Sequence, residues 1–391
     1  MTRAEWFQRV VVRAGFLPLA ATLLLALRGS AWSLEPMIDE SVMDSSRVKA
    51  LNLIKESKFS DSIQAEEQAL KIAEEKNGPL HPSLAPLYNN LGTLYRCLGD
   101  YGKAEQNYKW ALALLEKNFG PRHPRVIGTL ENLAALYNDL GRFEEAGFEA
   151  EKALSIREAN AFQDPQNLAH TQGLLGQIET SLQNYSQAQT LFQKALKNLK
   201  NDSNADSGVS ITFLNSLAQA YQSEQDDSQA QTCLEKSLDI ARKNFPDDAI
   251  EVADAMERLA DFFHSRGLDE KAKPLYASAL KIDQRYVGTV YSYESLPYLK
   301  RLAKAFFTVG DAKSSEALWQ KSLQTEEKIF GPRHPQTALD LSQLAQVEWA
   351  LKEKSKARKD LKESIDILKS DFSDNHPLVV QVQTQLEKLE K

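Results

Sequence analysis

Histidine is the residue type whose spacing first suggests chemistry in this chain. His81, His123, His334 and His376 each precede a proline, and they form two pairs whose members are 42 residues apart. Imidazole is a common zinc ligand, bonded at about 2 Å. A 42-residue spacing instead places one histidine in each unit of a helical repeat, and packed helical layers lie about 10 Å apart. Neighbouring histidines therefore cannot share an ion, and the sequence predicts no metal site and no cofactor.

Catalytic signatures are also missing from the sequence. It contains no Walker loop, no GxSxG or HExxH motif, no CxxC pair and no glycine-rich dinucleotide turn. The repeat described below occupies the chain from residue 39 onward and leaves no room for a catalytic domain. We therefore predict that the protein is not an enzyme.

The charge balance excludes one class of partner. The chain carries 47 Lys and Arg against 54 Asp and Glu, a net charge of -7, with 42% hydrophobic residues. Nucleic acid requires a basic face, so it is not an expected partner. The two cysteines, Cys97 and Cys233, fall three repeats apart, which is beyond the reach of a disulfide. We expect them to be small apolar helix residues.

The N-terminal segment differs in kind from the rest of the chain. A basic start is followed by fourteen uncharged residues, 14–27, and then by small residues. This pattern predicts a signal peptide over residues 1–33, cleaved after Ala31 or Ser33, and export to a periplasm or the exterior. An uncleaved N-terminal anchor, which would be the only membrane attachment, and an organellar transit peptide remain alternatives, although the apolar run is short for a membrane span.

A Leu followed by a small residue recurs with a period of 42 or 43 residues. This column comprises Leu91, Leu133, Leu175, Leu217, Leu259, Leu302 and Leu344. A second column of small residues keeps the same register and comprises Ala69, Ala111, Ala153, Ala195, Ser237, Ala279, Ser322 and Ser364. Two independent columns with one period indicate a repeat array.

Residues 81–122 illustrate one repeat. Tyr88, Leu91 and Tyr95 fall on one helical stripe, which we name helix A, and Ala104 and Ala111 fall on a second stripe, helix B. A Gly-Asp turn separates the two. Small residues let the backbones approach, and each pair of helices buries its face only by stacking on the next pair.

The order of large and small positions resembles the tetratricopeptide (TPR) signature, whose usual period is about 34 residues. The longer period here, together with Phe-Gly-Pro-Arg-His-Pro at 119–124 and 330–335, looks like the kinesin-light-chain subtype. The resemblance implies an all-α superhelical solenoid in which A helices line a concave groove that binds extended peptides. In the joint we expect Gly120 to form a left-handed C-cap, His123 an N-cap and Pro124 the next first turn.

Counting outward predicts about eight helix-turn-helix repeats over 39–375 and a C-terminal capping helix over 376–391. The repeats fall near 39–80, 81–122, 123–164, 165–206, 207–248, 249–291, 292–333 and 334–375. The polar stretch 198–208 suggests a looser seam between two halves.

Helix A residues outside the packing stripe are the predicted partner-binding set. They are Asn89, Asn90, Arg96, Asn132, Asn138 and Asn215, with a basic spot at Lys300, Arg301 and Lys304. Asparagine offers a donor and an acceptor to a peptide backbone, and a basic spot suits a ligand carboxylate. Asn90 and Asn132 resemble the ligand-holding asparagines of kinesin light chains. The alternatives are plain solvation for the asparagines and ion pairing between repeats six and seven for the basic spot.

Together these features predict an exported scaffold that holds a peptide or partner segment in its concave groove. The alternative is a structural or assembly subunit of an envelope complex that uses its convex face or its ends.

Overall fold

The computed structural model describes residues 59–159, 165–200, 207–286, 296–308 and 310–390. Within these ranges the elements are α-helices and short 3-10 helices, without a β-strand, which confirms the all-α class. The predicted signal peptide, 1–33, and the first helix of the first repeat lie outside the described residues. No helix among the described residues is both long and apolar enough to cross a membrane.

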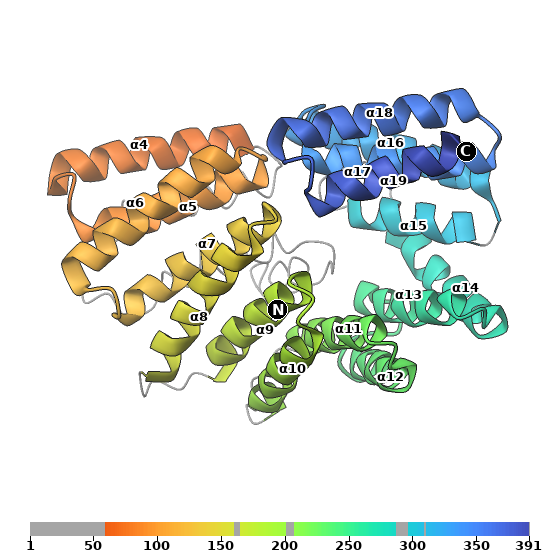
Figure 1. Ribbon diagram of the computed structural model, residues 1–391, viewed down its shortest axis with the longest axis horizontal. Helices are drawn as coiled ribbons and strands as arrows, with labels where there is room; N and C mark the ends of the chain where they lie inside the picture. The colour runs from red at the N-terminus through yellow and green to blue at the C-terminus, as the bar shows by residue number, and fades with distance from the viewer. Residues whose placement is uncertain (1–58, 160–164, 201–206, 287–295, 309, 391) are drawn as a thin grey trace. The chain divides into compact units, whose positions relative to one another are not determined.

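The chain divides into two compact units, Met1–Asp247 and Asp248–Lys391. The boundary therefore does not fall in the polar stretch 198–208, and the expected seam there is wrong, because α10 and α11 pack on each other across it. The described helices of the first unit (Figure 1) are α4 (Phe59–Asn77), η1 (Pro82–Leu84), α5 (Ala85–Cys97), α6 (Tyr101–Phe119), η2 (Pro124–Val126), α7 (Ile127–Asp139), α8 (Phe143–Ala159), α9 (Pro165–Ser181), α10 (Tyr185–Lys200), α11 (Ser207–Ser223) and α12 (Asp227–Asn244).

The second unit continues the same alternation of helices. Its described helices are α13 (Ile250–Ser265), α14 (Asp269–Tyr286), α15 (Leu296–Thr308), α16 (Ala312–Phe330), α17 (Pro335–Ala350), α18 (Lys354–Asp371) and α19 (Pro377–Glu390). The last of these packs on α18, where the sequence places a capping helix.

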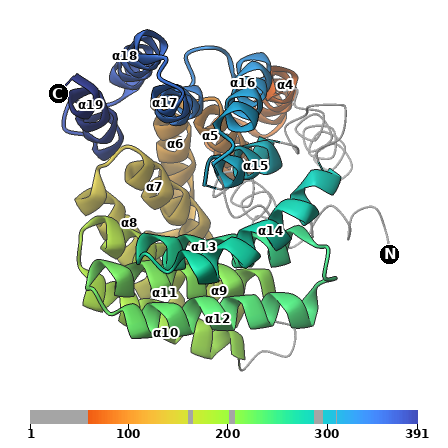
Figure 2. The same cartoon turned by 90° about the vertical axis from the view of Figure 1, so that its right-hand side faces the viewer.

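Helices pair within a repeat more closely than between repeats. In the first unit the A helices are α5, α7, α9 and α11, and each contacts the next A helix in line. Successive B helices do not pack on each other to the same extent. Closer spacing on one side is what curvature toward that side produces, so the A helices line the concave side of this unit. Figure 2 shows its last four helices, α9 to α12, side by side.

Close approach within a repeat depends on the small residue that follows each column leucine. A Cβ at Gly92 on α5 would lie 2.6 Å from the ring of Tyr108 on α6. Gly176 on α9 meets the ring of Phe192 on α10 in the same way, at 2.9 Å. Because both rings are fully buried, neither has room to retreat. These contacts confirm the predicted alternation of large and small residues.

The turn between helices A and B demands a positive φ at one position in every described repeat. Glycine supplies it at Gly99, Gly141, Gly267 and Gly310, whereas Gln183, Gln225 and Lys352 adopt it at φ values of 63°, 62° and 67°. A side chain in this region costs about 1–2 kcal/mol, which glycine avoids. Three repeats therefore carry strain in this turn.

The joints between repeats follow the expected capping chemistry with one correction. His81, His123, His334 and His376 each accept a hydrogen bond at Nδ1 from the backbone N–H two residues on. The histidines are thus N-caps, as predicted for His123. Gly120 has φ 93° and ψ 157°, so its φ is positive but it is not in the left-handed helical region expected of a C-cap. That conformation is essentially restricted to glycine.

Candidate protein-binding groove on the A helices

A ladder of side-chain contacts ties the A helices of neighbouring repeats together, from α5 to α11 in the first unit and from α15 to α17 in the second. Its rungs join the residue two places before the column leucine of one repeat to the residue four places before the column leucine of the next. Asn89 Nδ2 donates to Thr129 Oγ1 at 2.8 Å, and Thr171 Oγ1 donates to Glu131 Oε1 at 2.5 Å. In the second unit the same register gives an ion pair, Lys300 Nζ to Asp340 Oδ1, at 2.9 Å.

Between the fourth and fifth repeats the same register gives a close packing contact instead of a polar one. A Cβ on Gly173 of α9 would lie 2.2 Å from the ring of Phe213 on α11, so only glycine fits beneath that ring. The ladder residues Thr129, Thr171 and Phe213 were not identified from the sequence. A search for compatible pairs 40 residues apart, two short of the period, would have found them.

Four buried polar atoms on the A helices of the first unit have no hydrogen-bond partner among the described residues. The Oδ1 atoms of Asn89, Asn138 and Asn215 are buried without a hydrogen-bond partner in the described residues, and so is Nη1 of Arg96. These four residues occupy only two positions of the repeat, two before and five after the column leucine, which lie seven residues apart on one helical face. Buried polar atoms are normally paired, so this face retains unused hydrogen-bonding capacity.

Arg96 is held by a neighbouring repeat. Its side chain is 2% exposed, and its Nε donates to Asp139 Oδ2 at 2.6 Å. Burial by itself would lower the pKa of Arg96, but the Asp139 carboxylate more than offsets this and raises the pKa. The guanidinium is therefore fixed and charged, and its Nη1 has no hydrogen-bond partner in the part of the chain that the structure describes.

Asn90 and Asn132 lie deeper than the resemblance to kinesin light chains implied. Asn90 is 4% exposed and donates to Glu66 Oε1 on α4 at 3.2 Å, while Asn132 on α7 is 6% exposed. The bond to Glu66 accounts for the Asn90 amide nitrogen without a ligand. A ligand-holding role for these two residues stays a prediction.

The predicted basic spot is matched by carboxylates in the second unit. Arg301 Nε lies 3.0 Å from Glu257 Oε2, and Lys304 pairs with Asp261, both acids being on α13. Lys300 pairs with Glu326 on helix B of its own repeat, 2.5 Å from Oε1, and with Asp340 of the next repeat, 2.9 Å from Oδ1.

These contacts set the charge state of Lys300. Burial lowers the pKa of Lys300, but Asp340 and Glu326 raise it beyond its usual value, so the ammonium is retained. Ion pairing between repeats accounts for all three bases, and their binding of a ligand carboxylate stays a prediction.

The predicted site residues thus fall in two groups. Those on α5, α7 and α11 lie on the A helices of the first unit, and the three bases lie on α15 of the second. Cys97 on α5 and Cys233 on α12 are buried and free of a disulfide, as expected. Burial also raises the pKa of the Cys97 thiol to about 12, which leaves it unreactive.

Several solved structures are similar to part of this chain. BtubC from P. vanneervenii is 19% identical, covering 58% of this chain and 91% of its own, with a TM-score of 0.44. A chain described as a kinesin light chain of Podosopora anserina with nearly identical TPR-like repeats is 19% identical, covering 54% of this chain and 99% of its own, with a TM-score of 0.47. The apo form of RapI is 16% identical, covering 72% and 96%, with a TM-score of 0.48.

Comparison with curated proteins gives no match. The family model for the tetratricopeptide repeat matches residues 46–117, 125–201, 208–285 and 294–370, well over half of the sequence. Together with the paired helices of both units, this match shows that the chain belongs to the tetratricopeptide repeat family.

Proposed function

We propose that this protein is a non-catalytic scaffold that holds an extended segment of a partner protein against the A helices of its first unit. Membership of the tetratricopeptide repeat family supports an interaction role, because such repeats commonly mediate protein–protein contacts. Export through residues 1–33 belongs to the same proposal and rests on the sequence pattern alone.

The observation that carries the proposal is the set of unpaired acceptors on that face. Asn89, Asn138 and Asn215 each have a buried Oδ1 that no described residue hydrogen-bonds, and these residues recur at only two repeat positions. An extended peptide presents backbone N–H donors along its length, which can pair with such acceptors whatever its side chains are.

The test is affinity capture followed by direct titration. The chain and a variant with Asn89→Ala, Asn138→Ala and Asn215→Ala are used as baits, with circular dichroism and melting temperature measured for both. A matched control carries Gln106→Ala and Gln187→Ala, which remove two exposed amides from the B helices α6 and α10. We expect a partner held by the chain and the control and lost by the asparagine variant.

Backbone recognition is then tested on the peptide itself. The binding segment of the partner is synthesised with single N-methyl groups, each of which removes one N–H donor. At the contacted positions we expect affinity to fall at least tenfold, while side-chain substitutions at the same positions have smaller effects. Equal binding of methylated and unmethylated peptides would refute the proposed mode of recognition.

A second candidate, the structural or assembly subunit, is favoured by exposed apolar side chains on the B helices. Ile72 on α4, Trp110 on α6 and Phe148 on α8 are 46%, 51% and 66% exposed. Large exposed apolar side chains often mark contact surfaces. If Trp110→Ser and Phe148→Ser abolish capture while the asparagine variant retains it, the partner binds the convex side and the groove proposal is wrong.

A further inference from the structure

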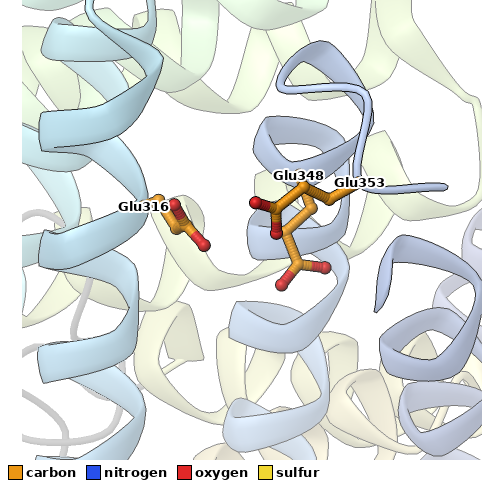
Figure 3. A group of neighbouring side chains, drawn as sticks. All are labelled: Glu316, Glu348 and Glu353. Carbon is orange, nitrogen blue, oxygen red and sulfur yellow. The ribbon is translucent and has the colours of Figure 1, made fainter. Parts of the chain in front are cut away.

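Three carboxylates of the second unit converge although they come from three different elements. Glu316 lies on α16, Glu348 on α17 and Glu353 in the turn before α18. One oxygen of each lies within 4.8 Å of the others, and Figure 3 shows the Glu316 carboxylate facing the other two across a gap between the helices. The separations along the sequence, 32 and 5 residues, form no recognisable ligand motif.

Glu348 supplies the observation that distinguishes this group from an ordinary acidic surface. Its side chain is 2% exposed, and its Oε2 is buried without a hydrogen-bond partner in the described residues. A buried carboxylate oxygen left unpaired is costly, and native proteins usually satisfy such an atom with a donor, a cation or water. A fourth carboxyl, Asp360 on α18, is within hydrogen-bonding reach of the Glu348 carboxyl, and its charge raises the pKa of Glu348.

The neighbouring ammonium group of Lys356 offsets only part of the negative charge of the three carboxylates. Lys356 contacts Glu353 and has its Nζ 3.7 Å from Glu316 Oε1, and its charge opposes the raised pKa of Glu348, but its side chain is 57% exposed. Gln320 Nε2 donates to Glu316 Oε1 at 3.3 Å. With Asp360 included, four carboxylates and one ammonium leave three negative charges, of which one divalent cation would balance two.

The ligand chemistry selects the kind of cation. All three groups offer carboxylate oxygens, and neither histidine nor cysteine is among them, which favours a hard cation over zinc or copper. Calcium binds oxygens at about 2.3–2.6 Å, so two of its ligands can lie up to about 5 Å apart. Magnesium holds its ligands at about 2.0–2.1 Å in a near-ideal octahedron and so demands a tighter arrangement.

We propose that Glu316, Glu348 and Glu353 form a calcium site at the joint between the last two repeats, with Lys356 competing for the same carboxylates. A bound ion would tie α16 to α17 and to the start of α18. This inference is independent of the groove. It also goes beyond the expectation of no metal, which rested on histidine spacing and did not address carboxylates.

The first test titrates calcium chloride into the full chain, stripped of metal with a chelator, by isothermal calorimetry at neutral pH. We expect saturable binding with a dissociation constant below about 1 mM, as in calcium sites of modest charge. Glu348→Gln should weaken binding at least tenfold. The matched control is Glu327→Gln, which removes one exposed carboxylate from α16 and should leave the affinity unchanged. Magnesium should bind more weakly than calcium.

A second variant moves affinity the opposite way, so a folding defect cannot account for both results. Lys356→Gln removes the competing ammonium and should tighten calcium binding at least threefold. Lys362→Gln, which removes an exposed lysine from the same helix, should not. No saturation by about 10 mM calcium, equal affinity of the chain and Glu348→Gln, equal affinity of Lys356→Gln and Lys362→Gln, or magnesium binding as tight as calcium would each overturn the proposal.

Discussion

Asn89 on α5 donates a 2.8 Å hydrogen bond to Thr129 on α7, forty residues further along the chain. The bond joins the A helices of the second and third repeats, and its register recurs at Glu131 with Thr171 and at Lys300 with Asp340. Neighbouring repeats are therefore held together on this face by specific polar contacts as well as by apolar packing. Four predictions follow from such contacts and from the turns between helices.

Removing the acceptor of this bond should destabilise the array. Thr129 is 1% exposed, so Thr129→Val keeps the shape of the side chain but leaves the Asn89 amide without its partner. We expect a loss of about 1–2 kcal/mol in the free energy of unfolding. Urea denaturation followed by circular dichroism measures it. Thr212→Val is the control, because the exposed Thr212 hydroxyl bonds only to Gly208 of its own helix; an equal loss in both variants would contradict the ladder.

The glycine beneath the Tyr108 ring should not tolerate a methyl group. Gly92→Ala places a Cβ 2.6 Å from that fully buried ring, and overpacking of this kind costs about 1–3 kcal/mol. Gly102→Ala on α6 meets no atom within 4 Å and should instead stabilise the chain by about 0.5–1 kcal/mol, because alanine favours helix over glycine. Thermal melts of both variants are the measurement, and shifts of the same sign would be inconsistent with this packing.

Relieving a strained turn should stabilise the fold. Gln225 adopts φ 62° at the position that Gly141 fills two repeats earlier. Gln225→Gly removes the left-handed strain and should gain about 0.5–1 kcal/mol after the greater chain entropy of glycine is subtracted. The reverse change, Gly141→Gln, should destabilise by about 1–2 kcal/mol. Chemical denaturation of the pair tests this, and an unchanged midpoint in both variants would show that the turn is not strained.

The buried acid pair at the joint of α16 and α17 should make stability depend on pH. Burial raises the pKa of Glu326, and Asp340 beside it raises that pKa further, although Lys300 opposes the shift. A raised pKa in the folded state means that the stabilising contribution is fully present below the unfolded value of about 4.3 and is lost as pH rises through the folded value. Glu326→Gln removes this dependence, because glutamine does not titrate.

The free energy of unfolding of Glu326→Gln minus that of the unsubstituted chain should therefore be larger at pH 8 than at pH 5. Urea unfolding of both proteins at the two pH values gives the difference. The control is Glu327→Gln, whose side chain is exposed on the same helix and should show no such trend. A difference that is independent of pH would show that Glu326 titrates normally.

The sequence by itself determined the architecture. The 42-residue columns, the small residues such as Gly92 and the His-Pro joints are local or strictly periodic features, and the structure has helix A, helix B and histidine N-caps at the positions they indicate. Periodicity reports which face of a helix is buried, because the spacing of side chains along one helix is fixed by its geometry.

What the polar residues do was decided only by the tertiary structure. The sequence alone predicts both Asn90 and Arg96 to be exposed helix residues. In the structure Asn90 donates a hydrogen bond to Glu66, whereas Nη1 of Arg96 has no partner among the described residues. Glu348 and its two companions carry no motif, because residues 32 positions apart meet only when the last two repeats stack. Contacts of this kind depend on the rotation and spacing between neighbouring repeats, which one repeat's own sequence does not encode.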